Sequence, residues 1–101
     1  MRMVLFFDLP SVTAKDRKEY RHFVKQLKEH GFFALQESVF SKMCANQTVA
    51  DLTVADIKKF LPKEGSVMSL TITEKQFNSL QILLGSIETD VLFSDEKVVK
   101  L

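Results

Sequence analysis

The chain has 101 residues, which is enough for one domain and too short for two domains that each bury a core. Its 46% hydrophobic and 27% charged residues exclude a disordered tail, and its one cysteine, Cys44, excludes an internal disulfide framework. Fourteen Lys and Arg against thirteen Asp and Glu give a formal net charge of +1. As a whole-chain average, this charge argues against a nucleic-acid-binding protein, because such proteins usually carry a strong positive net charge.

The first predicted element is a strand over Met3–Phe7, because five apolar residues in a row are typical of a strand buried on both faces. This run is too short for a signal peptide or a membrane helix, so we expect a cytoplasmic protein without membrane contact. Pro10 ends the strand.

Thr13 followed by Asp16 predicts the start of a helix, and Gly31 fits the left-handed position beyond the end of this helix. The apolar face of this helix comprises Tyr20, Phe23, Val24 and Leu27.

The middle of the chain predicts one strand region and a second helix. Phe32–Lys42 is either one bent strand or two short ones, because its apolar alternation slips. Thr53 and Asp56 repeat the helix-start pattern, and Pro62 stops the helix that follows.

The last part of the chain predicts another strand over Val67–Thr73, with one covered face formed by Met68, Leu70 and Ile72. Phe77–Leu84 suits either an edge strand or a helix. The order βαββαβ predicts an α+β sandwich of the ferredoxin-like type, a single domain over residues 1–101. Its core is expected over about 1–84, and residues 85–101 form an acidic extension that could dock on a partner.

Asp8 is the strongest single candidate for a functional residue, since it follows a buried strand. Alternation along the strand puts its side chain on the same face as Val4 and Phe6. It is either an aspartate that caps a turn before a proline or a metal ligand. One carboxylate is a poor site for a hard cation such as Mg²⁺. A two-fold dimer would bring two copies of Asp8 together.

Basic residues on the first helix form the second candidate site. They fall within an arc of roughly 100° beside the apolar face, at about 100° per residue. Such a row is either a solvated face or a surface for a phosphate backbone, and most acidic residues of the segment lie off it. The row consists of Lys18, Arg21, Lys25 and Lys28, with Arg17 beside it.

Four stretches of this sequence together resemble the CRISPR-associated Cas-two family, in the version found in type II systems. The resemblance covers nearly the whole chain to about Gly85. The stretches are Met1-Arg2-Met3-Val4-Leu5-Phe6-Phe7-Asp8-Leu9-Pro10, Asp16-Arg17-Lys18-Glu19-Tyr20-Arg21-His22-Phe23, Gly31-Phe32 with Gln36-Glu37-Ser38-Val39-Phe40-Ser41-Lys42, and Thr73-Glu74-Lys75-Gln76-Phe77.

The resemblance implies a homodimer in which the final strand of one subunit, here within Phe77–Leu84, joins the sheet of the other. It implies that Asp8 is the catalytic and metal-binding aspartate, with Mg²⁺ or another divalent cation as cofactor. Phe7 and Phe40 are then expected near the dimer cleft. Some relatives have tyrosine at the position of Phe7, so a mechanism that needs a hydroxyl there is in doubt. Arg17 and Arg21 fall where relatives place arginines along the first helix.

Family members are described both as metal-dependent endonucleases on RNA or DNA and as the central dimer of the spacer-acquisition complex with the Cas-one integrase. We expect the scaffold role, with double-stranded DNA as the partner, because the sequence offers one clear acid and no obvious base. The alternatives are a Mg²⁺-dependent phosphodiesterase independent of the integrase and a small regulatory or toxin-like ferredoxin domain.

The charge distribution agrees with a nucleic-acid partner despite the near-neutral average. Residues 1–30 carry seven Lys and Arg against four Asp and Glu, residues 31–64 carry four of each, and residues 65–101 carry three against five. The positive excess of +3 therefore belongs to the segment with the first helix. Binding of nucleic acid is expected to be confined to one face.

Overall fold

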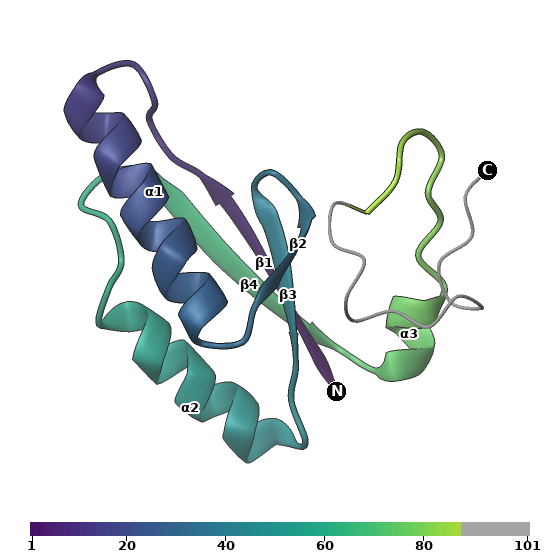
Figure 1. Ribbon diagram of the computed structural model, residues 1–101. Coiled ribbons are helices and arrows are strands. Elements are labelled where there is room, and N and C mark those ends of the chain that lie inside the picture. The colour runs from purple at the N-terminus through teal and green to yellow at the C-terminus, as the bar shows by residue number, and fades with distance from the viewer. Residues whose placement is uncertain (88–101) are drawn as a thin grey trace.

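The computed structural model describes residues 1–87, which form a four-stranded antiparallel sheet with the strand order β2-β3-β1-β4. The elements in chain order are β1 (Arg2–Asp8), α1 (Ala14–Glu29), β2 (Phe33–Gln36), β3 (Val39–Met43), α2 (Gln47–Lys58), β4 (Ser66–Ile72) and α3 (Glu74–Asn78). Figure 1 shows α1 and α2 on one side of the sheet and α3 on the other. The βαββαβ order and α+β ferredoxin-like fold predicted from the sequence are confirmed.

The main core lies between the sheet and the two long helices. Alternation along β1 directs Met3, Leu5 and Phe7 to this side, where each is less than a tenth exposed. Phe23 and Leu27 of α1 and the buried residues of α2 close the same core from the helix side. β1 is a central strand, so its apolar run is buried as predicted.

The opposite side of the sheet, named here the open face, is only partly covered. Phe77 of α3 is buried there against Val4, Phe33 and Leu35. Beside it, the buried guanidinium of Arg2 forms an ion pair with Glu74, with Nη2–Oε1 at 2.7 Å and Nε–Oε2 at 3.1 Å. These contacts fix α3 against the end of the sheet.

The helix boundaries confirm one prediction from the sequence and correct another. α1 begins with the expected capping box between Thr13 and Asp16, and Gly31 beyond its end has φ of +90°. The start predicted for the second helix at Thr53 is wrong, because α2 begins earlier with Asn46 as its N-cap. The Thr53 hydroxyl instead donates to the Val49 carbonyl inside the helix, at 2.8 Å.

The strands also correct two expectations. Phe32–Lys42 forms two strands, with a register shift between Ala34 and Gln36. β4 was expected to have a covered apolar face, but Met68 and Leu70 are 62% and 53% exposed, because they lie on the open face at the edge of the sheet.

Phe77–Leu84 is not a strand in the single chain: α3 ends at Asn78, and residues 79–87 contain neither helix nor strand. Pairing of this segment with a second copy stays a prediction. The acidic extension expected over residues 85–101 lies mostly outside the described residues. None of the helices within residues 1–87 is long and apolar enough to cross a membrane.

Candidate functional site

Asp8 is exposed at the end of β1, where it pairs in register with Ser66 of β4. The backbones of the two strands come very close here. A Cβ atom added to Gly65 would lie 2.6 Å from the Asp8 carbonyl oxygen, and φ of +101° also requires glycine at this position. The turn at Gly65 therefore sets where Asp8 lies.

A surface hollow, named here the Asp8 hollow, brings Asp8 together with residues of α1 and of the turn between β2 and β3. It combines two carboxylates, two guanidinium groups and three hydroxyl groups, which are groups that bind cations and phosphates. Its lining residues are Asp8, Leu9, Ser11, Arg17, Tyr20, Arg21, Glu37 and Ser38. The two candidate sites found in the sequence thus meet at this hollow, through Asp8, Arg17 and Arg21.

Two residues of the hollow, Glu37 and Tyr20, were not among the site residues predicted from the sequence, where Tyr20 was assigned to the apolar face of the first helix. Tyr20 lies in α1, and its hydroxyl donates to the Glu37 carbonyl oxygen at 3.0 Å and lies 3.2 Å from Ser38 Oγ. Since a phenol has one proton and a carbonyl only accepts, Ser38 is the donor in the second bond. The Phe7 N–H also donates to the Ser38 carbonyl oxygen, at 3.0 Å. These bonds hold the turn against α1 and β1.

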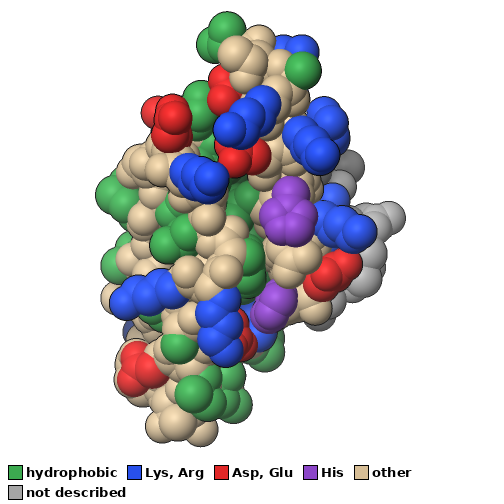
Figure 2. Space-filling view, turned by 90° about the vertical axis from the view of Figure 1, so that its left-hand side faces the viewer, with side chains coloured by type: hydrophobic (Ala, Val, Ile, Leu, Met, Phe, Trp, Pro, Cys, Tyr) green, Lys and Arg blue, Asp and Glu red, His purple; other side chains and the backbone are tan. Residues whose placement is uncertain are grey.

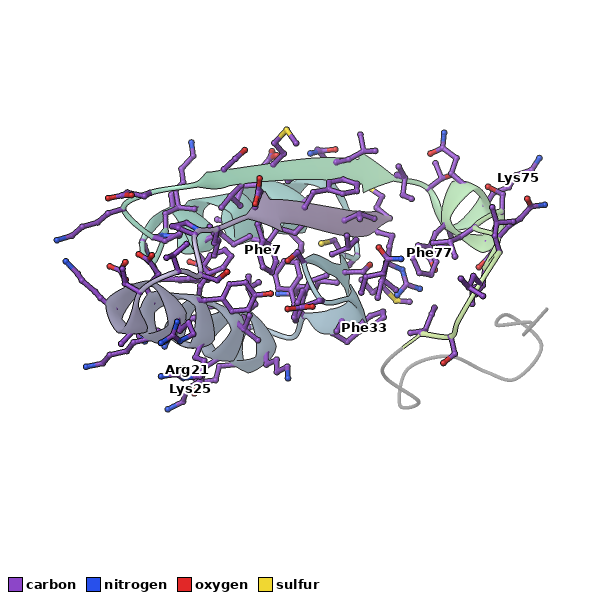
Figure 3. The ribbon with its side chains drawn as sticks, turned by 90° about the horizontal axis from the view of Figure 1, so that it is seen from above. Phe7, Arg21, Lys25, Phe33, Lys75 and Phe77 are labelled. Carbon is purple, nitrogen blue, oxygen red and sulfur yellow. The ribbon has the colours of Figure 1, made fainter. Side chains whose placement is uncertain are left out.

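The basic row runs along the outer side of α1, with all of its residues exposed. Figure 3 shows Arg21 and Lys25 pointing away from the sheet, and Figure 2 shows Lys and Arg side chains gathered around the two histidines, which belong to α1 and its C-cap. Within residues 1–87, ion pairs form only between Arg2 and Glu74 and between Lys59 and Asp56. The cations of Lys18, Arg21, Lys25 and Lys28 are therefore not neutralised by a described carboxylate.

Asp16, at the start of α1, is engaged in the capping box with Thr13. The Thr13 N–H donates to the Asp16 carboxylate at 3.1 Å, and this hydrogen bond lowers the pKa of Asp16. Arg17, beside the row, donates from Nη1 to the Val12 carbonyl oxygen at 2.8 Å. It thereby ties the loop after Asp8 to the start of α1.

The side chains of Phe7 and Phe40 lie in the core between the sheet and the helices, and their expected nearness to a dimer cleft stays a prediction. They are 6% and 2% exposed, and their ring centroids lie 5.5 Å apart. The Phe7 ring also contacts the ring of Phe23 at 5.2 Å. The alternation of β1 explains the burial of Phe7, since Phe7 points to the side of the sheet opposite to that of Asp8.

The described residues do not provide a complete metal site within one chain. No group of three or more His, Cys, Asp or Glu side chains among residues 1–87 could hold a metal ion. The Asp8 hollow supplies two carboxylates, which are fewer oxygen ligands than a cation such as Mg²⁺ takes.

Residues 1–80 match the family model described as CRISPR associated protein Cas2. Two proteins named CRISPR-associated endoribonuclease Cas2, from Ligilactobacillus salivarius and Treponema denticola, are each 44% identical over 101 residues, which is the full length of both chains. A third, from Streptococcus mutans, is 43% identical over all of this chain and 93% of its own.

The fold also matches a solved structure. The crystal structure of Streptococcus pyogenes Cas2 at pH 6.5 superposes with a TM-score of 0.63 and 20% sequence identity, over 82% of this chain and 99% of that one. At this identity the match supports the fold alone.

Proposed function

The chain belongs to the CRISPR-associated protein Cas2 (Cas-two) family, and we propose that it is an adaptation protein of a CRISPR system. In this role it is a homodimeric scaffold that binds double-stranded DNA together with the Cas-one integrase during spacer acquisition. The observation that carries the proposal is the unneutralised row of cations along α1, which ends beside the Asp8 hollow.

The basic row suits the backbone of a duplex better than it suits a particular base sequence. Exposed Lys and Arg side chains on the outside of a helix contact phosphates, which fixes the position of the duplex and reads no bases. The row extends over Lys18–Lys28, about three turns of helix, so that a homodimer presents two such rows. A scaffold that fixes the length of the bound duplex needs only such contacts to phosphates.

The open face supports a homodimer. Met43, Met68 and Leu70 are each more than half exposed there, on a sheet whose other side is filled. An exposed apolar surface of this kind marks a protein interface. The outer edge of β4 is also unpaired within residues 1–87, so that it can receive a strand from a second copy.

A second candidate function is a metal-dependent endonuclease, because the curated relatives are named endoribonucleases and Asp8 is exposed. In this case the Asp8 carboxylates of two copies would hold Mg²⁺, which when bound polarises a phosphate and activates water. The residues of the chain would contribute by holding the nucleic acid, with Arg17 and Arg21 beside the carboxylate.

The scaffold proposal is tested by the salt dependence of duplex binding. We expect the reversal of Lys18, Arg21 and Lys25 to Glu to weaken binding and to flatten the plot of log affinity against log salt, by about 0.9 for each phosphate that the protein no longer neutralises. A matched control reverses Lys58, Lys59 and Lys63, which changes the charge equally but lies at the end of α2 and beyond it. Equal flattening by both sets would show that only net charge matters.

Asp8→Ala separates the two candidate functions. If the protein acts as a scaffold, the variant keeps its affinity for duplex DNA, its assembly with the integrase and its support of spacer acquisition. If it acts as a nuclease, cleavage of RNA or DNA by the purified wild-type protein stops with a chelator and in the variant. Loss of acquisition while assembly stays intact would contradict the scaffold role.

A further inference from the structure

The outer side of α1 carries a second surface hollow, named here the α1 groove. It adjoins the Asp8 hollow, because Tyr20 and Arg21 line both. Its lining comes from two neighbouring rows of side chains, in which residues follow one another at intervals of one helical turn. One row comprises Tyr20, Val24 and Lys28, and the other comprises Arg21, Lys25 and Glu29. The cations of the groove belong to the basic row, but its apolar surface has no part in contacts to phosphates.

The floor of the α1 groove is apolar. Tyr20 and Val24 are half-buried: they pack against the main core and leave part of each side chain exposed in the groove. The aliphatic stems of Lys25 and Lys28 add apolar surface beside them. The backbone of a duplex that contacts the charged ends of these side chains keeps its bases stacked inside, so that the apolar floor stays unfilled.

The Tyr20 ring is held in one orientation. Its hydroxyl donates to the Glu37 carbonyl oxygen at 3.0 Å and accepts from Ser38 Oγ at 3.2 Å. The ring also contacts the ring of Phe7, which is buried in the core, with the centroids 6.0 Å apart. A ring that is already fixed loses little rotamer freedom when a flat partner stacks on it, and this loss is one of the costs of binding.

The groove suits an occupant that is both anionic and apolar. Arg21, Lys25 and Lys28 surround the apolar floor, and in the described part of the chain no ion pair involves these cations (Figure 3). The one carboxylate of the groove, Glu29, accepts from Gln26 Nε2 at 3.5 Å. A nucleotide in a single strand meets both requirements, because its phosphate is anionic and its unpaired base offers flat apolar faces.

We propose that the α1 groove is a seat for one unstacked base of a single strand, which lies against the Tyr20 ring with Val24 and the Arg21 guanidinium beside it. This inference rests on the proposed binding of nucleic acid, and it adds a contact to a base on a surface that otherwise contacts only phosphates. Aromatic rings and guanidinium groups both stack on bases, whatever the sequence.

The neighbouring hollow favours a nucleic-acid strand over an acidic peptide as the occupant. Tyr20 and Arg21 join the groove to the Asp8 hollow, where Arg17 is a further group that binds phosphate. A strand with one base in the groove can therefore place an adjacent phosphate in the hollow. An acidic peptide with apolar side chains would match the groove alone.

The experiment compares two ligands of equal charge on the full chain. Oligothymidylate and an abasic strand of the same length carry the same phosphates, but only the first has bases. We expect oligothymidylate to bind at least about fivefold more tightly, which is the low end of what stacking of one base on an aromatic side chain contributes. Oligouridylate replaces oligothymidylate in a second arm, which distinguishes an RNA strand from a DNA strand as the preferred source of the base.

NMR of protein labelled in tyrosine reports the contact directly. The chain has one tyrosine, so that all labelled ring signals come from Tyr20. These signals should move upfield when oligothymidylate binds, because a stacked base adds its ring current. The abasic strand should leave them nearly in place.

Two substitutions separate the ring of Tyr20 from its hydroxyl. Tyr20→Phe and Tyr20→Leu both remove the hydrogen bonds to Glu37 and Ser38, but only Tyr20→Phe keeps the ring. The ratio of the affinities for oligothymidylate and the abasic strand should persist in Tyr20→Phe and fall to about one in Tyr20→Leu. The NMR measurement on the wild type decides the question if Tyr20→Leu does not fold.

Four results would overturn the inference. Equal affinities of the wild type for oligothymidylate, oligouridylate and the abasic strand would reject the base seat, while duplex binding by the basic row would stand. An unchanged ratio in Tyr20→Leu would place the base elsewhere. Movement of the Tyr20 signals with a peptide of glutamate and leucine, and not with any strand, would make the groove a protein-docking site. Failure to bind any strand or duplex would reject the proposed binding of nucleic acid itself.

Discussion

The position of Asp8 depends on a residue that carries no side chain. Gly65 allows β4 to begin directly beside the end of β1, because its positive φ and the missing Cβ permit the approach to the Asp8 carbonyl oxygen. The backbone conformation at Gly65 therefore determines the position of Asp8 in the hollow. Its charged groups come from three different parts of the chain.

Gly65→Ala is expected to destabilise the fold by more than about 3 kcal/mol, since it adds backbone strain and a clash with Asp8 and Leu9. Gly31→Ala is the matched control: φ there is also positive, but the nearest atom to an added Cβ is the flexible Lys42 side chain at 3.5 Å. The control should cost about 1 kcal/mol, from strain alone. Urea unfolding measures both, and equal losses would show that the close approach to Asp8 is not the cause.

Sequence patterns could predict Asp8, Arg17 and Arg21, because strand alternation and helical spacing each act within one element. They could not predict Glu37 and Tyr20 as their neighbours. These residues meet only because β3 pairs with β1 and α1 packs over the same strand, which brings positions 17 residues apart within 3.0 Å. In the polar stretch around Glu37 the family resemblance favoured Phe40 instead, which is a core residue.

Among the helices, the same sequence signal succeeded once and failed once. A threonine followed by an aspartate three residues later marks the start of α1, but in α2 the same pair lies inside the helix. The difference lies in what else can cap: Asn46 accepts from the Val49 N–H at 2.9 Å, which leaves the Thr53 hydroxyl to bond within the helix. The spacing alone does not distinguish these cases.

The capping box of α1 predicts a pH dependence of stability. The pKa of Asp16 is lowered in the folded state, chiefly by the hydrogen bond from the Thr13 N–H, so its contribution is present above about pH 4 and is lost as the pH falls through the lowered value. Unfolding free energies of the wild type and Asp16→Asn should therefore converge below about pH 4. A difference that stays constant from neutral to acidic pH would contradict this.

For the whole molecule, the main asymmetry is between the two sides of the sheet. The side toward α1 and α2 is filled by the chain itself, as the apolar spacing of both helices predicts. The open face was not foreseen, because alternation in β4 shows that one face is apolar but not whether the same chain covers it. Only the folded structure shows that the chain leaves this face of β4 exposed.

Leu70→Glu is expected to weaken self-association by roughly tenfold or more, because a charge replaces an apolar side chain on the open face. Leu52→Glu is the control: Leu52 is 61% exposed, but it lies on α2, on the other side of the sheet. Sedimentation equilibrium of both variants measures the change. Equal weakening by the two variants would mean that the open face is not the interface.

The alternation of β1 also limits how the chain can change its length. Met3, Leu5 and Phe7 face the helices, and Val4 and Phe6 face the other way. One apolar residue can replace another here at modest cost, but an inserted or deleted residue would exchange the two sets and turn Asp8 toward the core. Drift in this strand is therefore expected to appear as substitutions, and insertions and deletions are expected in the loops on either side of the helices.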